Sequence, residues 1–233
     1  MKYYVIVCLA LGSVILQGME PSKELYNAIT QGKKKEVQKF AKNCVLERRD
    51  TLGRTVLHMA VVAGKPVIAD ILINECPKLL HIGDRQGRIP LHYAAFCGRM
   101  PMVKYLVDAK SEIERKDANL WTPLFYAVAE LHLQVADLLI SNGAQADRRS
   151  KKGETLIHAS IPQKPCEEER ETKVQTLHHS MLQYLIKQKM VSGCITDYQW
   201  KSPVKKAREN LPENDMARKY LEHLESERQK PPR

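Results

Sequence analysis

Three histidines recur in matching sequence contexts and are the residues best suited to metal binding or acid–base chemistry. His58, His92 and His158 each follow a leucine or an isoleucine. Each also occupies the same place in a segment that recurs along the chain, so the three belong to separate layers and do not converge on one site. The sequence contains no G-x-S-x-G, Walker A, H-E-x-x-H or C-x-x-C motif. We therefore predict no enzyme activity, no cofactor and no metal site.

The cysteines do not indicate a disulfide framework. Cys8 lies in an apolar leader, which leaves five others, an odd number without the spacing of a zinc site. Cys44 and Cys76 lie 32 residues apart at matching positions of two recurring segments, which suggests small apolar fillers at helix ends. This cysteine usage is typical of a reducing compartment.

The recurring segments set the organisation of the chain. RTVLHMA at 54–60, RIPLHYA at 88–94, WTPLFYA at 121–127 and ETLIHAS at 154–160 follow one another at intervals of 33 or 34 residues. KSPVKKA at 201–207 is a later copy, and 23–28 is a degenerate first one. Each regular copy predicts a short helix, a break such as Gly98, and a second amphipathic helix. Neither helix can bury its apolar side alone, so we expect successive copies to stack.

A period near 33 with a T-P-L-H-x-A core resembles the ankyrin repeat family, and the resemblance covers about residues 22–224. It implies an all-α solenoid of stacked helix-turn-helix units with projecting β-turn fingers. It also implies that each histidine bonds to the threonine of its own repeat and to neighbouring backbone. Thr55 and Thr155 can supply that partner, whereas Ile89 cannot. The residues expected in the central core layers are Leu91, Ala94, Val103 and Leu106.

We predict a single domain, residues 19–226, that consists of six repeats. Their approximate ranges are 20–50, 51–84, 85–117, 118–150, 151–196 and 197–226, followed by a frayed tail at 227–233. The first and last repeats are degenerate and have the polar outer faces that caps require. The fifth contains an inserted loop, 162–175, whose prolines and mixed charges favour an exposed loop. That loop is either a surface extension without a role in binding or a partner-specific contact.

The fourth repeat departs from the pattern at two glycine positions. Leu120 stands where the other finger turns have glycine, and Leu131 stands at the break between the two helices. A non-glycine residue there costs on the order of 1 kcal/mol if the left-handed conformation is kept. We therefore expect the turn of the fourth repeat to differ locally.

Residues 1–18 form a separate leader. Its apolar run, Tyr3–Leu16, has 14 residues, fewer than the ~20 that a membrane-spanning helix needs. With Lys2 before it and Gly18 after it, the run fits a signal peptide. We expect no transmembrane span and a secreted protein, or a cytoplasmic protein if translation starts at Met19.

The net charge of +10 predicts an acidic partner. The ankyrin resemblance implies that the fingers and the inner side of the first helices form a concave binding face. The residues expected to contact the partner are Arg54, Arg85, Arg88, Phe96, Trp121, Arg148, Arg149, Lys151 and Lys152. Tryptophan and arginine are the side chains that most often carry interface energy.

These observations predict a non-enzymatic, monomeric scaffold that binds an acidic protein partner, acting as an effector or an inhibitor. The alternative is a basic adaptor for nucleic acid or an anionic membrane surface. Such attachment needs positive charge along a groove or stripe. Glu130, Glu154 and the acidic loop 167–171 interrupt the expected face, and they argue against this alternative, for nucleic acid and for an anionic membrane alike.

Overall fold

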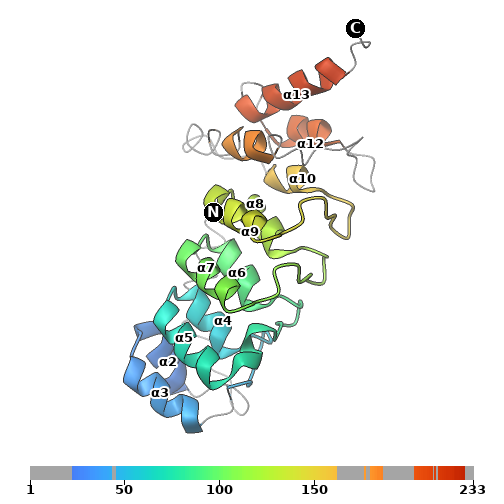
Figure 1. Cartoon of the computed structure of the whole chain (residues 1–233). Coiled ribbons are helices and arrows are strands. Elements are labelled where there is room, and N and C mark those ends of the chain that lie inside the picture. The colour runs from blue at the N-terminus through green and yellow to red at the C-terminus, as the bar shows by residue number, and fades with distance from the viewer. Residues whose placement is uncertain are drawn as a thin grey trace. The chain divides into compact units, whose positions relative to one another are not determined.

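The structure, a computed structural model, describes residues 23–43, 46–161, 176, 179–185, 202–211, 213 and 215–228. The leader, the inserted loop 162–175 and the last residues of the tail lie outside the described residues. The part that is described contains helices and turns and no strand. It falls into two compact units, unit 1 up to Arg115 and unit 2 from Lys116 (Figure 1).

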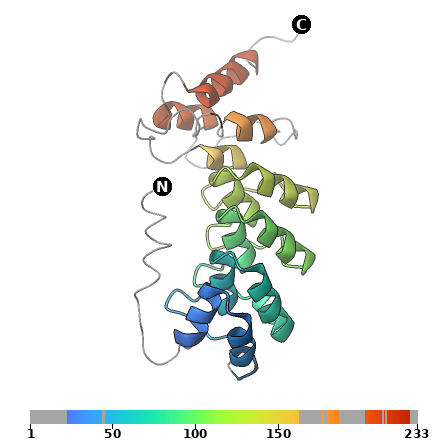
Figure 2. The ribbon, with the colours of Figure 1, turned by 90° about the vertical axis from the view of Figure 1, so that its left-hand side faces the viewer.

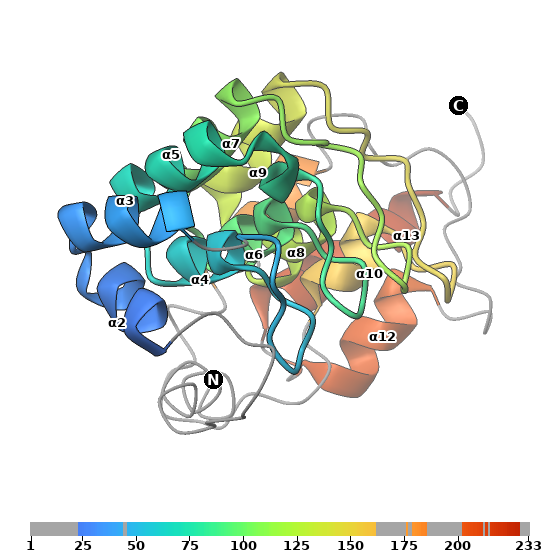
Figure 3. The ribbon, with the colours of Figure 1, turned by 90° about the horizontal axis from the view of Figure 1, so that it is seen from below.

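Unit 1 consists of successive antiparallel helix pairs. The pairs are α2 (Lys23–Gln31) with α3 (Lys34–Asn43), α4 (Val56–Val62) with α5 (Pro66–Glu75), and α6 (Pro90–Phe96) with α7 (Met100–Asp108). A short 3₁₀ helix, η2 (Pro77–Leu80), follows α5. The first helices stack in one row and the second helices in another, as Figure 3 shows for α2, α4 and α6 beside α3, α5 and α7.

Unit 2 continues with the same kind of element. It contains α8 (Pro123–Ala129) paired with α9 (Leu133–Ser141), then α10 (Leu156–Ser160), α12 (Pro203–Asn210) and α13 (Met216–Arg228). Residues 179–185 are also helical. Within this unit α10 contacts both α8 and α12, and α12 pairs with α13 (Figure 2).

The core lies between successive pairs, where the sequence pattern places it. Leu91 and Ala94 of α6 and Val103 and Leu106 of α7 are all 0% exposed, which confirms the predicted repeat register. Pro90 opens α6 at its first position, where its missing N–H would have no intrahelical partner.

The expectation that the turn of the fourth repeat differs locally from the others is wrong. Leu120 and Leu131 both adopt the left-handed conformation, with φ of 60° each. The N–H of Leu120 donates to the carbonyl oxygen of Asp117 at 3.0 Å, as the N–H of Gly87 does to Asp84 at 2.9 Å. The N–H of Leu131 likewise donates to Val128 at 3.1 Å. The hydrogen bonds of the turn hold leucine in a conformation that costs it strain.

Candidate binding surface

Each finger is a four-residue turn whose first side chain accepts hydrogen bonds from the turn itself. Oδ1 of Asp50 accepts from the N–H of Leu52 at 2.9 Å and of Arg54 at 2.8 Å. The N–H of Gly53 donates to the Asp50 carbonyl oxygen at 2.8 Å. The turn that begins at Asp84 has the same set of bonds. Both fingers of unit 1 are therefore closed loops, as the Asp-to-Gly spacing predicts.

The fingers of unit 2 are closed in the same way. Oδ1 of Asp117 accepts from the N–H of Asn119 and of Trp121, both at 2.8 Å. In the next finger the hydroxyl of Ser150 replaces the carboxylate. It accepts from the N–H of Lys152 at 3.2 Å and of Glu154 at 3.1 Å. Serine thus preserves the turn without adding a negative charge.

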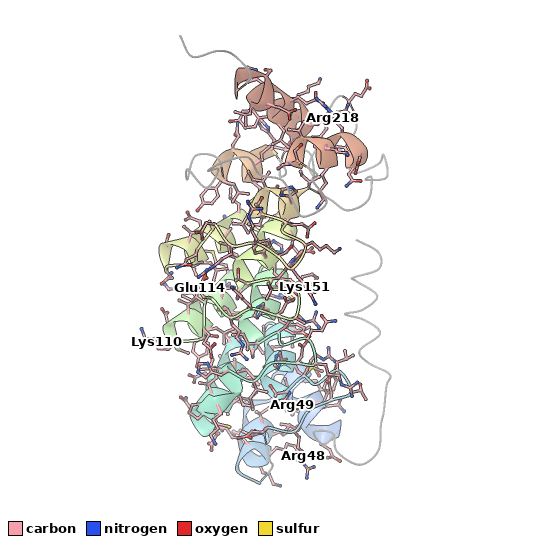
Figure 4. All side chains as sticks on the ribbon, turned by 90° about the vertical axis from the view of Figure 1, so that its right-hand side faces the viewer. Arg48, Arg49, Lys110, Glu114, Lys151 and Arg218 are labelled. Carbon is pink, nitrogen blue, oxygen red and sulfur yellow. The ribbon has the colours of Figure 1, made fainter. Side chains whose placement is uncertain are left out.

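Neighbouring fingers within a unit are bonded to each other. In unit 1 the N–H of Arg85 donates to the carbonyl oxygen of Leu52 at 3.0 Å, and in unit 2 the N–H of Lys151 donates to Asn119 at 2.7 Å. A Cβ atom on Gly53 would stand 2.7 Å from the Arg85 nitrogen, so only glycine permits this approach. Figure 4 views the side on which the finger loops project and labels Lys151.

Arg54 lies at the base of its finger rather than at the tip. Its Nη2 is 2.6 Å from Oδ2 of Asp50 and its Nε donates to the same oxygen at 2.7 Å. The arginine side chain is only 6% exposed. This buried pair closes the finger, so the charge of Arg54 is already neutralised within the protein.

Arg88 forms the corresponding pair in the next repeat and adds an aromatic partner. Its Nη2 is 2.7 Å from Oδ2 of Asp84 and donates to the Tyr93 hydroxyl at 2.9 Å. That hydroxyl donates to Asp84 at 2.7 Å. Burial disfavours the charged form of Asp84, but the hydrogen bonds from Arg88 and Tyr93 outweigh it and hold the carboxyl pKa below its ordinary value.

Three finger-tip cations have no ion pair among the described residues. Arg85, Lys151 and Lys152 occupy the central positions of their turns and are exposed. Among the described residues, no carboxylate lies within ion-pair distance of these three side chains. Each unit therefore presents positive charge at a finger tip, held on a backbone that is already hydrogen-bonded.

Two arginines outside the predicted set of contacts also lie beside a finger of unit 1. Arg48 and Arg49 precede Asp50 and are exposed, and both are labelled in Figure 4. The guanidinium of Arg49 donates to the carbonyl oxygen of Gly83 at 2.9 Å. Leu52, at the tip of the same finger, is 48% exposed. The sequence signal for these residues was their position: Arg48 and Arg49 directly precede a predicted turn, and Leu52 lies within it.

The predicted aromatic residues lie in different units. Phe96 is half-buried near the end of α6 in unit 1. Trp121, in unit 2, is half-buried and packs on the rings of Phe125 and Tyr126, with centroid distances of 5.6 and 5.3 Å. The Tyr126 hydroxyl donates to Asp117 at 2.7 Å. Trp121 thus takes the place that Arg88 has in the preceding repeat, above a tyrosine that bonds to the finger aspartate.

The two remaining predicted contacts, Arg148 and Arg149, precede the last finger. Arg148 is half-buried, whereas Arg149 is exposed and donates to the carbonyl oxygen of Gly153 at 3.3 Å. At the base of that finger stands Glu154, whose carboxylate is 3.3 Å from Nζ of Lys206. The acidic residue is therefore neutralised from α12, and the tip of this finger remains basic.

The histidines have the structural role that the family resemblance implies. Nδ1 of His58 lies 3.0 Å from both the N–H and the hydroxyl of Thr55, and its Nε2 lies 2.9 Å from the carbonyl oxygen of Arg88. His158 has the same bonds to Thr155. His92 accepts from the backbone N–H of Ile89 at 3.1 Å. The isoleucine therefore keeps the backbone hydrogen bond of this motif, although it has no hydroxyl to make the second one.

The fourth repeat has Phe125 at the position of these histidines. Thr122, at the position of Thr55, is buried, and its hydroxyl has no hydrogen-bond partner within the described part of the chain. The substitution of an aromatic ring for imidazole accounts for this unpaired hydroxyl, because the ring offers no nitrogen to accept its proton.

Within the described part of the chain, no three His, Cys, Asp or Glu side chains are grouped so that they could hold a metal ion. No helix there is long and apolar enough to cross a membrane.

Three proteins illustrate what the chain is similar to. It is 38% identical over 103 residues to the "Probable 26S proteasome regulatory subunit p28" of Saccharomyces cerevisiae, which covers 43% of this chain and 45% of that protein. It is 27% identical over 142 residues to the "Putative ankyrin repeat protein L371" of Acanthamoeba polyphaga mimivirus, covering 60% of this chain and 18% of that one. It is 30% identical over 99 residues to the "Ankyrin repeat protein nuc-2" of Neurospora crassa, covering 42% and 9%. The match thus spans less than half the length of each relative.

Family models give the assignment directly. The model for ankyrin repeats in three copies matches residues 25–117, and the model for a single ankyrin repeat matches residues 119–151. These ranges cover most of α2, the helices from α3 to α9, and the fingers that begin at Asp50, Asp84 and Asp117. The chain belongs to the ankyrin repeat family.

Proposed function

We propose that this ankyrin repeat protein is a non-enzymatic binding module that takes an acidic protein segment on its finger tips. Ankyrin repeats are a protein-binding fold, and the acidic character of the partner is the further step. The observation that carries it is a contrast between the bases and the tips of the fingers. The cations at the base are paired, whereas Arg85, Lys151 and Lys152 at the tips are exposed and have no carboxylate within ion-pair distance among the described residues.

Preorganisation supports this proposal. The finger backbones are held by their aspartate or serine side chains and by the bonds from Arg85 to Leu52 and from Lys151 to Asn119. A partner that contacts the tips therefore does not have to order the loops first, and ordering is one of the main costs of binding. Charges on fixed loops also favour fast, steered association with an acidic surface.

Apolar contact is available next to these charges. Leu52 is 48% exposed at a finger tip, and Leu120, the last residue of its finger turn, is 41% exposed. An acidic segment that also carries apolar side chains would match such a surface better than a purely acidic one. This favours a protein partner over nucleic acid, whose recognition depends mainly on phosphate contacts.

Fluorescence anisotropy with labelled peptides tests the proposal. The probe is a peptide of alternating glutamate and leucine, and a peptide of alternating lysine and leucine serves as its control. Arg85→Glu, Lys151→Glu and Lys152→Glu together are expected to weaken binding of the acidic peptide by at least about tenfold.

The matched variant reverses three exposed cations on second helices or on α13. These are Lys39, Lys104 and Lys219. It changes the net charge equally and is expected to change affinity by less than about threefold, because exposed charges beyond a Debye length are screened. Equal losses in the two variants would mean that net charge alone attracts the peptide, and that the finger tips are not the site.

We also propose that the leader 1–18 directs export, on the grounds of its short apolar run after Lys2. Mass spectrometry of the protein from its native source tests this. A mature N-terminus near Met19 in extracellular fluid supports export, whereas an acetylated Met19 in the cytosol would show that translation starts there.

A further inference from the structure

The turns that join the two helices of each repeat in unit 1 form an edge that the finger proposal does not use. We call it the turn edge and define it as residues 32–35, 63–67 and 98–101. In the second repeat α4 runs from the finger to the turn, and α5 runs back. Seven helical residues span about 10 Å. The turn edge therefore lies at the opposite end of the helix pairs from the fingers.

Long cationic side chains connect the successive turns of this edge. Carbons and Nζ of Lys65 lie 3.6–3.7 Å from the place where a Cβ on Gly32 would stand. The guanidinium of Arg99 lies 3.1–3.3 Å from the corresponding place on Gly64. Each side chain thus reaches back over the turn of the preceding repeat. Residues far apart in sequence are brought into one row of positive charge.

The first repeat extends the row. Lys33, Lys34 and Lys35 are exposed at the start of α3, and the one carboxylate beside them, Glu36, is 3.2 Å from Nζ of Lys33. Within the described residues, no other ion pair involves the five cations of the edge. The edge therefore has a clear excess of positive charge.

Folding alone explains only part of this pattern. Lys65 and Arg99 lie over the ends of α2 and α4, where the helix dipole favours cations. Lys34 and Lys35 occupy the first turn of α3, where the dipole disfavours them. They are present in spite of a small cost to stability, which points to a use outside the fold.

Exposed apolar side chains lie in the same turns as two of the cations. Val67 is 45% exposed at the start of α5, and Met100 is 40% exposed at the start of α7. They follow Lys65 and Arg99 in equivalent turns of adjacent repeats. The edge therefore combines positive charge with exposed apolar groups, along the turns at one end of the stacked helix pairs.

We propose that the turn edge docks on a membrane surface that contains anionic lipid. A line of projecting turns can touch a plane at every repeat. A basic side chain near an anionic bilayer contributes about 1 kcal/mol, and the apolar side chains can enter the headgroup region. The fingers, at the other end of the helix pairs, stay free to hold a partner.

Vesicle co-sedimentation of the full chain tests the proposal. The probes are phosphatidylcholine vesicles with and without about a third of phosphatidylserine, at low and at physiological salt. Binding is expected only with the anionic vesicles and is expected to weaken with salt. Lys34→Glu, Lys65→Glu and Arg99→Glu together should reduce the partition constant by at least about tenfold.

The matched control reverses Arg48, Lys78 and Arg85, which are exposed at the finger end of unit 1, and it should lower the partition constant less than about threefold. Circular dichroism and urea unfolding verify the fold. If the glutamate variant is misfolded, Lys34→Gln, Lys65→Gln and Arg99→Gln replace it, with a smaller loss expected.

The apolar part is tested separately. Val67→Ser with Met100→Ser is expected to weaken binding most at high salt, where the electrostatic contribution is screened.

Equal losses in the edge and finger-end variants would overturn the proposal, as would equal binding to neutral vesicles. Tighter binding to a DNA duplex, lost in the edge variant, would assign the edge to nucleic acid instead. The edge variant should bind the acidic peptide as the wild type does, so failure here is distinguishable from failure of the finger proposal.

Discussion

His58 donates its Nε2–H to the carbonyl oxygen of Arg88, 2.9 Å away and 30 residues further along the chain. Its Nδ1 accepts from Thr55 at 3.0 Å, so the neutral ring uses both nitrogens to join two adjacent repeats. Burial lowers the pKa of His58 from 6.5 to about 4, since a charged ring would be desolvated there.

This lowered pKa predicts a loss of stability in mild acid. The unfolded chain takes up the His58 proton near pH 6.5 and the folded protein only near pH 4, so the contribution is present above pH 6.5 and is lost as the pH falls between these values. From pH 7 to pH 5 the free energy of unfolding should fall by about 2 kcal/mol on account of His58. Urea unfolding at several pH values measures this. The His58→Gln variant should lack that part of the pH dependence, and an unchanged slope would contradict the assignment.

The unpaired hydroxyl of Thr122 predicts opposite effects of one substitution at two equivalent positions. Thr122→Val removes a buried group that has no partner among the described residues, so the free energy of unfolding should stay constant or rise by up to about 1 kcal/mol. Thr55→Val removes a hydroxyl that bonds to His58 and should cost about 1–3 kcal/mol. Valine and threonine share β-branching, so backbone preference is matched. Equal costs at both sites would show that Thr122 has a partner in solution.

Much of this could be predicted from the sequence because the repeat period determines which residues face the core. Leu91 and Leu106 are buried as expected, and the finger register follows from the Asp-to-Gly spacing. It was harder to predict whether each arginine is buried in an ion pair or exposed to solvent. Arg54 and Arg85 look alike in sequence, yet one is buried against the aspartate four residues before it and the other is exposed. That four-residue spacing was visible in the sequence and was the missed signal.

The turn edge could not be predicted, because it depends on where long side chains lie. Nothing in the sequence indicates that Lys65 extends over Gly32 in the previous repeat. The left-handed leucines were also mispredicted, since local preference favours another conformation and only the hydrogen bonds of the repeat impose this one.

Leu131 offers a way to raise stability. Its φ of 60° costs a leucine about 1–2 kcal/mol, whereas glycine adopts it freely but has a more disordered unfolded state. Leu131→Gly should therefore raise the free energy of unfolding by about 0.5–1 kcal/mol. Leu131→Ala is the matched control, because it truncates the side chain and keeps the strain. If the alanine variant is as stable as the glycine variant, the left-handed strain is absent.

The approach of the two fingers in unit 1 gives the last prediction. A Cβ on Gly53 would stand 2.7 Å from the backbone nitrogen of Arg85, and its φ is 79°. Gly143 also has a positive φ, 95°, but a Cβ there meets nothing within 4 Å. Gly53→Ala should cost about 2–4 kcal/mol, because it adds a backbone clash to the strain, and Gly143→Ala should cost about 1 kcal/mol from strain alone. Urea unfolding of both variants measures the difference, which reports the contact between fingers. Similar losses would mean that the fingers do not touch in solution, and the preorganised tip on which the binding proposal rests would lose its support.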